Sequence, residues 1–335
     1  MPHENFRTFH VLPEQEDKTL AAVIREFLPE ASWSQVKQWV RQRRVQVNGN
    51  LCVDEERRLT PSDVLRISEQ PFAAPIAASD VRVVHVDEHL VVIDKPAGVT
   101  TLRHAEEREW SHRRKNAQPT LEELVDLLLA KPSTARVSQR KPHKKPPKIA
   151  KQLVRPVHRL DRDTSGLMVF ARTPEAEVDL IRQFKKHTIE RAYIAIAMGR
   201  LEATTIENYL VRDRGDGLRG GTNDAQSPAA QRAVTHVKPL ETLSGYTVVE
   251  CRLETGRTHQ IRIHLAELGH MLCGEKTYLR TLQGPLVEDT SDAPRQMLHA
   301  AVLGFVHPAN QQPLQFLSPL PRDMQRVLEK LRRIR

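Results

Sequence analysis

The chain has 335 residues, 39% of them hydrophobic, which allows a sizeable core and a small additional domain. No apolar run approaches the ~18 residues of a membrane helix, and the N-terminus lacks the apolar stretch of a secretory signal. Its three cysteines, Cys52, Cys251 and Cys273, lie far apart, which argues against a disulfide framework and favours a reducing compartment. We therefore expect a two-domain cytoplasmic protein without a membrane partner.

The positive charge is concentrated in one segment. The 51 Lys and Arg exceed the 42 Asp and Glu by nine, and residues 131–155 contain nine Lys and Arg but no acidic residue. Four prolines in this segment favour an extended chain. We interpret it as a basic arm that contacts nucleic-acid phosphates, with Lys144 and Lys145 as candidate contacts. A solvated loop without a specific partner is the alternative.

Residues 1–17 are expected to form an N-terminal extension, and residues 18–68 a small module with two helices and two strands. Leu20, Val23, Ile24 and Phe27 repeat at helical spacing, and Ser32 is placed to cap a second helix. Strands are predicted at 44–47 and 64–67. This order, with the phrase RRVQVNG, resembles the S-four-type RNA-binding module.

Four basic residues gather near the end of that second helix. The resemblance implies contact with RNA for this cluster, which consists of Lys37, Arg41, Arg43 and Arg44. The alternative is that the cluster only complements the negative end of the helix dipole.

A linker with two prolines, residues 69–80, separates the module from a larger domain at 81–330. Strands are predicted at 81–86 and 90–93, followed by a corner in which Lys95, Pro96 and Gly98 have structural roles. Thr120 starts a capping box before a helix with a leucine-rich face.

The most informative stretch is VHRLDRDTSGLMVFAR, at residues 157–172. Asp161 is flanked by Arg159 and Arg162, and a run of β-formers follows Gly166. The pattern places a carboxylate in a polar loop at the edge of a sheet, where reactive groups are often held. An ordinary solvated turn is the alternative.

Beyond this stretch, Thr173 is expected to cap a helix that has Pro174 at its first position. A strand at 190–198 carries Tyr193, residues 212–230 are expected to form a loop, and strands are predicted at 232–238 and 246–253. The segment LETGRTHQIRIHLAELGH at 253–270 has a helical apolar face that leaves Arg262 on a different stripe.

Several of these motifs resemble those of RluA-type pseudouridine synthases, which isomerise uridines in structured RNA. The string HRLDRDTSGL resembles their catalytic motif, which implies that Asp161 is catalytic. The phrases around Arg191-x-Tyr193 and Arg262 imply a tyrosine in the active site and an arginine that pairs with Asp161. The motif LHAAVLGFVHP implies that Leu298 lines the uracil pocket, and Glu275 stands where the family more often has aspartate.

The resemblance implies an α+β fold, with a central mixed, largely antiparallel sheet flanked by helices in the catalytic domain. It also implies cofactor-independent isomerisation of uridine, because no atoms enter or leave in that reaction. Arg159 would fill the gap left by a flipped base or grip phosphates. Ribosomal RNA is the favoured substrate and tRNA the alternative, and we expect a monomer. Glu275 is expected to matter little to catalysis, and a core role remains the alternative for Tyr193.

Three other interpretations remain open from the residues alone. A metal-dependent nuclease would use Asp161, Asp163 and Glu254 to hold Mg²⁺. A zinc site would use His264, His270 and Cys273, although their spacing is not that of a standard zinc motif. A non-catalytic RNA-binding or ribosome assembly factor would need only the N-terminal module and the basic arm.

Overall fold

The computed structural model describes residues 6–48, 50–61, 63–72, 74–103, 107, 109–110, 112–130, 154–222, 224 and 226–334. Lys144 and Lys145 of the predicted basic arm lie outside the described residues. The chain divides into two compact units, one formed by Met1–Ile76 with Arg103–Thr120 and the other by Ala77–Leu102 with Leu121–Arg335. Within the described ranges, no helix combines the length and apolarity needed to cross a bilayer.

The first unit contains a four-stranded antiparallel sheet in the order β1-β4-β2-β3. Its strands are β1 (Phe6–His10), β2 (Val45–Val47), β3 (Asn50–Leu51) and β4 (Val64–Ser68). Its helices are α1 (Leu20–Phe27), α2 (Trp33–Arg41), α3 (His112–Ala117) and the short 3₁₀ helix η1 (Pro13–Gln15). The prediction that Ser32 caps the second helix is confirmed, because Ser32 and Gln35 form a capping box. β1 was not predicted from the sequence.

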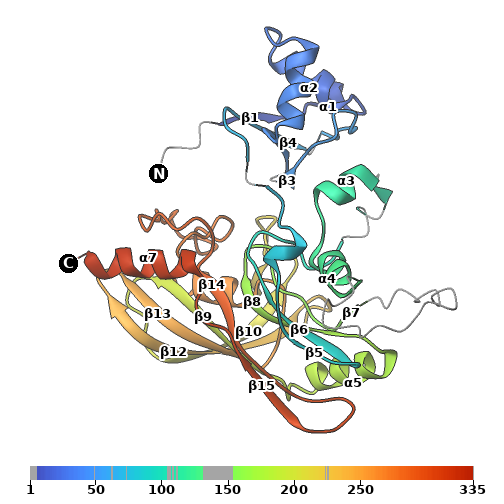
Figure 1. Ribbon diagram of the computed structural model, residues 1–335. Helices are drawn as coiled ribbons and strands as arrows, with labels where there is room; N and C mark the ends of the chain where they lie inside the picture. The colour runs from blue at the N-terminus through green and yellow to red at the C-terminus, as the bar shows by residue number, and fades with distance from the viewer. Residues whose placement is uncertain are drawn as a thin grey trace, which may run out of the picture. The chain divides into compact units, whose positions relative to one another are not determined.

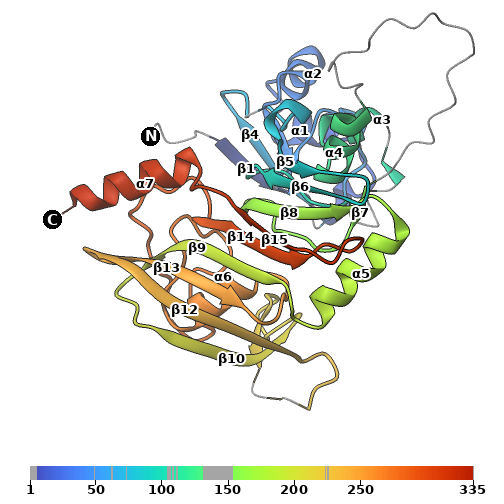
Figure 2. The ribbon, with the colours of Figure 1, turned by 60° about the horizontal axis from the view of Figure 1, so that its bottom comes forward.

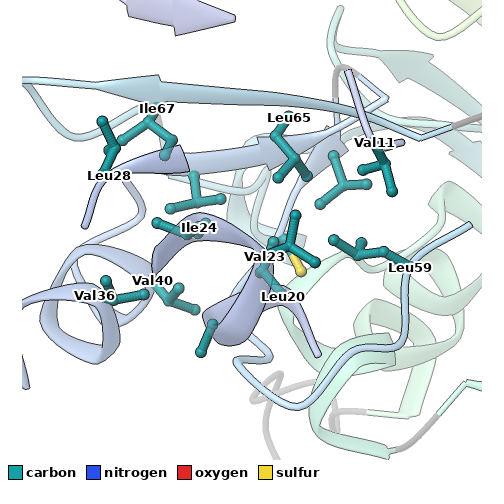
Figure 3. Close-up of a cluster of buried hydrophobic side chains, with 14 of the residues drawn as sticks. Val11, Leu20, Val23, Ile24, Leu28, Val36, Val40, Leu59, Leu65 and Ile67 are labelled. Carbon is teal, nitrogen blue, oxygen red and sulfur yellow. The ribbon is translucent and has the colours of Figure 1, made fainter. Parts of the chain in front are cut away.

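The core of this unit lies between the two longer helices and the sheet (Figure 3). Most of the apolar residues that recur at helical spacing in α1 and α2 contribute to it, so the amphipathic pattern of the sequence is realised, whereas Trp33 is exposed. The labelled core residues are Val11, Leu20, Val23, Ile24, Leu28, Val36, Val40, Leu59, Leu65 and Ile67.

The second unit is built on an eleven-stranded sheet, in which nine strands follow the order β11-β10-β12-β13-β9-β14-β8-β6-β5 (Figures 1 and 2). β15 also pairs with β14, and β7 with β8. The predicted mixed, largely antiparallel sheet is confirmed, because β8 and β14 alone pair in parallel among the described strands. The strands are β5 (Arg82–Val86), β6 (Leu90–Lys95), β7 (Arg155–Pro156), β8 (Ser165–Ala171), β9 (Glu190–Met198), β10 (Thr204–Val211), β11 (Gly220–Thr222), β12 (Gln231–Leu243), β13 (Tyr246–Leu253), β14 (Leu298–Val306) and β15 (Pro313–Leu317).

Helices cover this sheet through separate apolar clusters. α5 (Pro174–Lys185) packs through Leu180 against β8, and α7 (Arg322–Arg333) packs through Leu328 against β13. α6 (Gln260–Glu267) packs through Ile263 near β10 and β12. The unit also includes α4 (Leu121–Ala130) and the short helix η2 (Ala78–Asp80).

Two predictions about the second half of the sheet were wrong in detail. The segment expected to be entirely loop contains β11, whose two glycines pair with Leu210 and Val211 of β10 although glycine has low intrinsic strand preference. β12 continues well beyond residue 238, because a bulge between Pro239 and Glu241 carries the strand past a residue that has no amide donor.

The parallel pairing of β8 with β14 depends on Gly166. This residue has φ of +113° and lies opposite Ala300 of β14. A Cβ atom at this position would overlap the backbone of Ala300, so only glycine allows the two strands to approach. The pairing places the start of β14 next to the loop that precedes β8.

Candidate active site

A pocket of about 490 Å³ opens in the second unit, a volume typical of ligand sites. The segments that line it come from the loop before β8, the end of α5, strand β9, the end of β13, the start of α6 and the start of β14. Asp161, Tyr193, Arg262, Leu298 and Arg159 all line this pocket, although they are far apart in the chain.

Asp161 lies in a loop whose backbone accepts hydrogen bonds from the corner after β6. Thr101 Oγ1 donates to the backbone oxygen of Leu160 at 2.8 Å, and the amide of Gly98 donates to the oxygen of Arg162 at 2.9 Å. The Asp161 side chain keeps 18% of its surface exposed. The backbone contacts fix the loop while the carboxylate stays accessible from the pocket.

Lys95 anchors the same loop from the interior. Its ammonium donates to the backbone oxygens of Arg162 at 2.8 Å, Thr164 at 2.7 Å and Pro96 at 3.1 Å, so all three protons have acceptors. Burial lowers the pKa of Lys95 to about 7, an effect that the charges of Asp163 and Asp161 oppose. These contacts agree with the predicted structural role of Lys95.

Arg262 on α6 lies between two carboxylates. Its Nη1 is 3.4 Å from Asp161 Oδ2, whereas Nη2 and Nε donate to Glu275 Oε1 and Oε2 at 2.6 and 2.8 Å. The contact with Glu275 is therefore the shorter and bidentate one, which fixes the plane of the guanidinium. The hydrogen bonds and charge of the two carboxylates outweigh burial and raise the pKa of Arg262.

Glu275 is the more deeply buried partner, with 2% of its side chain exposed. Backbone amides of Lys276 and Thr277 donate to its Oε1 at 2.9 and 2.8 Å. Burial alone would raise the pKa of Glu275, but Arg262 and these amides hold it below its ordinary value. The prediction that Glu275 matters little concerned catalysis, whereas these contacts show that it orients Arg262.

His259 completes the surroundings of Asp161. Its Nε2 lies 3.8 Å from Asp161 Oδ1, and its Nδ1 is 2.7 Å from the hydroxyl of Tyr278. Burial lowers the pKa of His259, while Asp161 opposes that change. Burial raises the pKa of Tyr278 to about 12, so the hydroxyl keeps its proton and can donate it to Nδ1. The ring of Tyr278 also packs against the Arg262 guanidinium, 5.2 Å from its centre.

Tyr193 and Leu298 form the apolar part of the pocket. Both are largely buried and lie on adjacent strands, since Ala300 of β14 pairs with Tyr193 and Leu298 pairs with Ala195. Burial raises the pKa of Tyr193. They give the pocket an apolar lining in addition to the carboxylate of Asp161.

The basic residues predicted to contact RNA belong to different parts of the chain. Arg159 is exposed at the pocket, whereas Lys37, Arg41, Arg43 and Arg44 belong to the N-terminal unit. Arg44 is engaged within that unit, because its Nε donates to the backbone oxygen of Ser68 at 2.7 Å and its guanidinium packs on Trp39. Lys37 and Arg41 are exposed, and Arg41 lies 3.7 Å from Glu55.

The metal-site alternatives do not match the observed contacts. The Glu254 carboxylate pairs with His236 at 2.9 Å and Arg232 at 3.6 Å, and Glu254 is not among the residues that line the pocket. Both ring nitrogens of His264 are hydrogen bonded, to Thr235 and Asn208. Within the part of the chain that the structure describes, no three His, Cys, Asp or Glu side chains form a group suited to a metal ion.

Comparison with known proteins decides the family. Residues 89–267 match the RNA pseudouridylate synthase family, and residues 20–65 match the S4 domain. The chain belongs to the RNA pseudouridylate synthase family. It is therefore an RNA pseudouridine synthase, an isomerase that converts uridine in RNA to pseudouridine. The resemblances to the synthases and to the S-four-type module are confirmed.

Relatives of this synthase extend over nearly its whole length. A ribosomal large subunit pseudouridine synthase D from Nitrosomonas europaea is 33% identical and covers 94% of this chain and 85% of its own. An uncharacterized RNA pseudouridine synthase from Bacillus subtilis is also 33% identical, over 96% and 95% of the two chains. The solved structure of human RNA pseudouridylate synthase domain containing 4 has a TM-score of 0.54 at 23% identity, covering 75% of this chain and 93% of its own, which supports the shared fold.

Four residues around the site of this synthase were not assigned to it from the sequence. His259 follows Thr258 in the quoted motif, and Thr101 follows the Lys-Pro-Ala-Gly corner, but neither position carries a pattern that specifies its partner. Arg295 donates to the backbone oxygen of Asp163 at 2.9 Å and pairs with Asp323. The signal for Glu275 was its departure from the family pattern, although its partner was not evident.

Proposed function

We propose that this synthase modifies large-subunit ribosomal RNA as a cytoplasmic monomer, with Asp161 as its catalytic residue. The near full-length similarity to relatives named for the ribosomal large subunit supports this substrate class. We also propose that residues 18–68 bind RNA and that residues 81–330 carry out the reaction. tRNA is the alternative substrate.

The observation that carries the assignment of Asp161 is its position in the pocket. It is the only Asp or Glu among the lining residues that the structure describes, and Arg262 lies 3.4 Å from it. The Arg262 guanidinium places a positive charge beside this carboxylate. A partly exposed carboxylate beside a pocket suits a nucleophile or base that must reach the nucleotide.

The reaction breaks the bond between uracil N1 and the sugar C1′ and forms a bond between C5 and C1′, with loss of the C5 proton and gain of a proton at N1. The formula is unchanged, so the isomerisation needs neither an oxidant nor an energy source. The detached uracil has to be retained until it turns, which is the role we assign to Tyr193 and Leu298. Their burial supports this role, because it limits the access of water.

We assign the Tyr193 ring to packing on the base and its hydroxyl to transfer of the C5 proton. Because burial raises the pKa of Tyr193, the hydroxyl is protonated at neutral pH. It can therefore accept the C5 proton only while its own proton leaves to water, and N1 takes up one proton from water in return. Tyr193→Phe keeps the ring and removes the hydroxyl. We expect this variant to lose kcat with little change in KM, whereas Tyr193→Ala should also weaken substrate binding.

Binding of the RNA would involve the basic residues outside the reacting centre. We propose that Arg159 contacts RNA at the pocket and that Lys37, Arg41 and Arg43 do so on the N-terminal module. Arg44 belongs to the same proposed cluster, although its contacts with Ser68 and Trp39 limit how far it can reach. Lys144 and Lys145 are proposed contacts on sequence grounds alone.

The test uses pure protein, unmodified large-subunit ribosomal RNA and unmodified bulk tRNA, each incubated in the presence of a chelator. Nucleoside mass spectrometry then measures pseudouridine, with Asp161→Asn and the neighbouring Asp163→Asn as matched variants. We expect pseudouridine in the ribosomal RNA with wild type and Asp163→Asn, and none with Asp161→Asn. Turnover by a folded Asp161→Asn protein would overturn the assignment of the catalytic residue.

The same experiment tests the other parts of the proposal. Pseudouridine in tRNA alone would overturn the ribosomal substrate. Loss of activity in chelator, restored by Mg²⁺ or Zn²⁺, would contradict the expected independence of a metal. Sedimentation of the active protein tests the monomer, and a dimer at assay concentration would contradict it.

A further inference from the structure

Arg191 on β9 is a buried cation without a carboxylate partner in the described part of the chain. Only 9% of the residue is exposed. Its Nη2 donates to the backbone oxygens of Glu254 at 3.0 Å and Leu253 at 3.5 Å, while its Nε is buried without a hydrogen-bond acceptor. A buried guanidinium without a counter-charge is costly, so its presence at this position needs a reason.

The nearby carboxylates are engaged with other cations. Glu190, the preceding residue, pairs with Arg252 at 2.9 Å, and Glu254 pairs with Arg232 at 3.6 Å. Asp161 has Arg262 as its neighbour. The side chains described around Arg191 therefore leave its charge unbalanced.

An aromatic stack holds the guanidinium in position. The Arg191 Cζ atom lies 5.6 Å from the centre of the Phe184 ring, and Phe184 stacks on His158 with ring centres 4.5 Å apart. The amide of Val169 donates to His158 Nε2 at 3.1 Å. Loss of solvation, together with the charge of Arg191, lowers the pKa of His158 to about 3, so this ring is neutral and cannot compete for an anion.

Gly256 leaves one side of the guanidinium uncovered. A Cβ atom added to Gly256 would lie 2.6 Å from Arg191 Nη1, and Gly256 is itself exposed and lines the pocket. No hydrogen bond from Nη1 is found among the described residues. The missing side chain thus leaves Nη1 open toward the pocket.

The charged side chains that line the pocket around Arg191 are also mainly positive. Among the described residues that line it are five Arg and Lys, whereas Asp161 is the only carboxylate among them. Lys185, at the end of α5, is exposed, lines the pocket and follows Phe184, against which Arg191 packs. These cations are suited to bind an anion that comes from outside the protein.

We propose that Arg191, with Lys185 on its outer side, binds a backbone phosphate of the RNA next to the target uridine. The inference rests on the proposed function, because an RNA substrate carries one phosphate on each side of that nucleotide. A phosphate accepts hydrogen bonds from a guanidinium in its own plane, which the stack on Phe184 fixes. Arg191 is thus a substrate-binding residue that holds the RNA strand while the uridine occupies the pocket.

The test is a double substitution in enzyme and RNA. The RNA is an oligonucleotide that contains the uridine modified by wild type, made with a neutral methylphosphonate in place of one flanking phosphate. We expect Arg191→Gln to lower kcat/KM on normal RNA by about 10- to 100-fold, the range for a hydrogen bond between charged groups. The methylphosphonate at one flank should lower the wild-type value by a similar factor.

The combination distinguishes phosphate binding from a structural role. If Arg191 binds the replaced phosphate, the two changes together cause no further loss. Additive losses at both flanking positions would overturn the proposal, and so would full activity of Arg191→Gln. Arg182→Gln is the matched control, because Arg182 lies near the end of α5, is exposed, pairs with Asp179 and does not line the pocket. We expect this variant to behave like wild type.

A second variant keeps the test valid if Arg191→Gln does not fold. Gly256→Ala retains the cation but covers Nη1, and the backbone at Gly256 does not have a positive φ. We expect this variant to show the same non-additivity with the methylphosphonate. Additive behaviour of a folded Gly256→Ala enzyme would count against the proposal.

RNA binding gives a measurement that is independent of turnover. Loss of one phosphate contact should reduce the slope of log affinity against log salt by about 0.7 for single-stranded RNA. An unchanged slope for Arg191→Gln would overturn the proposal even if the wild type modified neither RNA. If wild type modifies tRNA, only the ribosomal substrate fails, and the same double substitution is carried out on tRNA.

Discussion

Glu275, rather than Asp161, is the closer partner of Arg262. Two hydrogen bonds of 2.6 and 2.8 Å join Arg262 to Glu275, compared with one contact of 3.4 Å to Asp161. The buried Glu275 carboxylate orients the guanidinium, which in turn points Nη1 toward the partly exposed Asp161 carboxylate. This arrangement lets the charge beside Asp161 stay fixed while Asp161 remains free to react.

The first prediction concerns the charge of Glu275. Glu275→Gln leaves Arg262 buried with a weakened partner, which should lower the free energy of unfolding by about 3 kcal/mol. We also expect kcat to fall at least 10-fold, because the guanidinium loses its orientation toward Asp161. Chemical unfolding and single-turnover assays measure the two effects.

Glu275→Asp is the control for this substitution. It keeps the negative charge with one methylene fewer and should recover most of the stability and activity. The role assigned to Glu275 would be wrong if Glu275→Gln were as stable and active as wild type.

The second prediction follows from the lowered pKa of Glu275. Because the pKa is lower in the folded protein than the ordinary value of 4.5, the unfolded chain binds the proton first as the pH falls. The stabilisation is therefore complete above pH 4.5 and is lost as the pH falls through the pKa of the folded state. In that pH window, the free energy of unfolding of wild type should fall more steeply than that of Glu275→Gln, by up to about 1.4 kcal/mol per pH unit. Parallel curves of unfolding free energy against pH would contradict this.

Local sequence patterns were sufficient for elements whose signals lie within a few residues. Thr173 and Pro174 specified the start of α5, and its capping hydrogen bond to Ala176 is present. The strand at Glu190–Met198 was predicted with its observed bounds from alternation alone. In these cases the side chains that define an element are also neighbours in the chain.

The contacts that build the site could not be obtained in this way. Lys95 and Thr164 are separated by 69 positions, and Arg262 and Asp161 by 101. The pairing of Arg262 with Asp161 was expected only through the resemblance to a family, and the contact of Arg262 with Glu275 was not expected. No local preference specifies which distant groups will share a buried position, because that depends on the order of strands in the sheet.

The third prediction separates two effects of glycine. Gly166→Ala should impose both an unfavourable φ and a clash with the backbone of Ala300, and lower stability by more than 4 kcal/mol. Gly245→Ala is the matched control, since Gly245 has φ of +76° but no atom within 4 Å of an added Cβ. That variant should lose only about 1 kcal/mol, from backbone strain. Equal losses in thermal unfolding would show that the approach of β8 to β14 is not limited by Gly166.

The fourth prediction concerns Lys95, whose ammonium binds the backbone of the loop that carries Asp161. Lys95→Met retains the volume of the buried stem but removes the donor from three backbone oxygens, with a cost of about 2–4 kcal/mol. The loop that carries Asp161 should then open more often, so amides in residues 160–164 should exchange with solvent at least 10-fold faster and kcat should fall. Hydrogen exchange with mass spectrometry measures this, and Lys238→Met, on an exposed position of β12, serves as the control. Wild-type exchange rates in Lys95→Met would mean that Thr101 and Arg295 hold the loop without it.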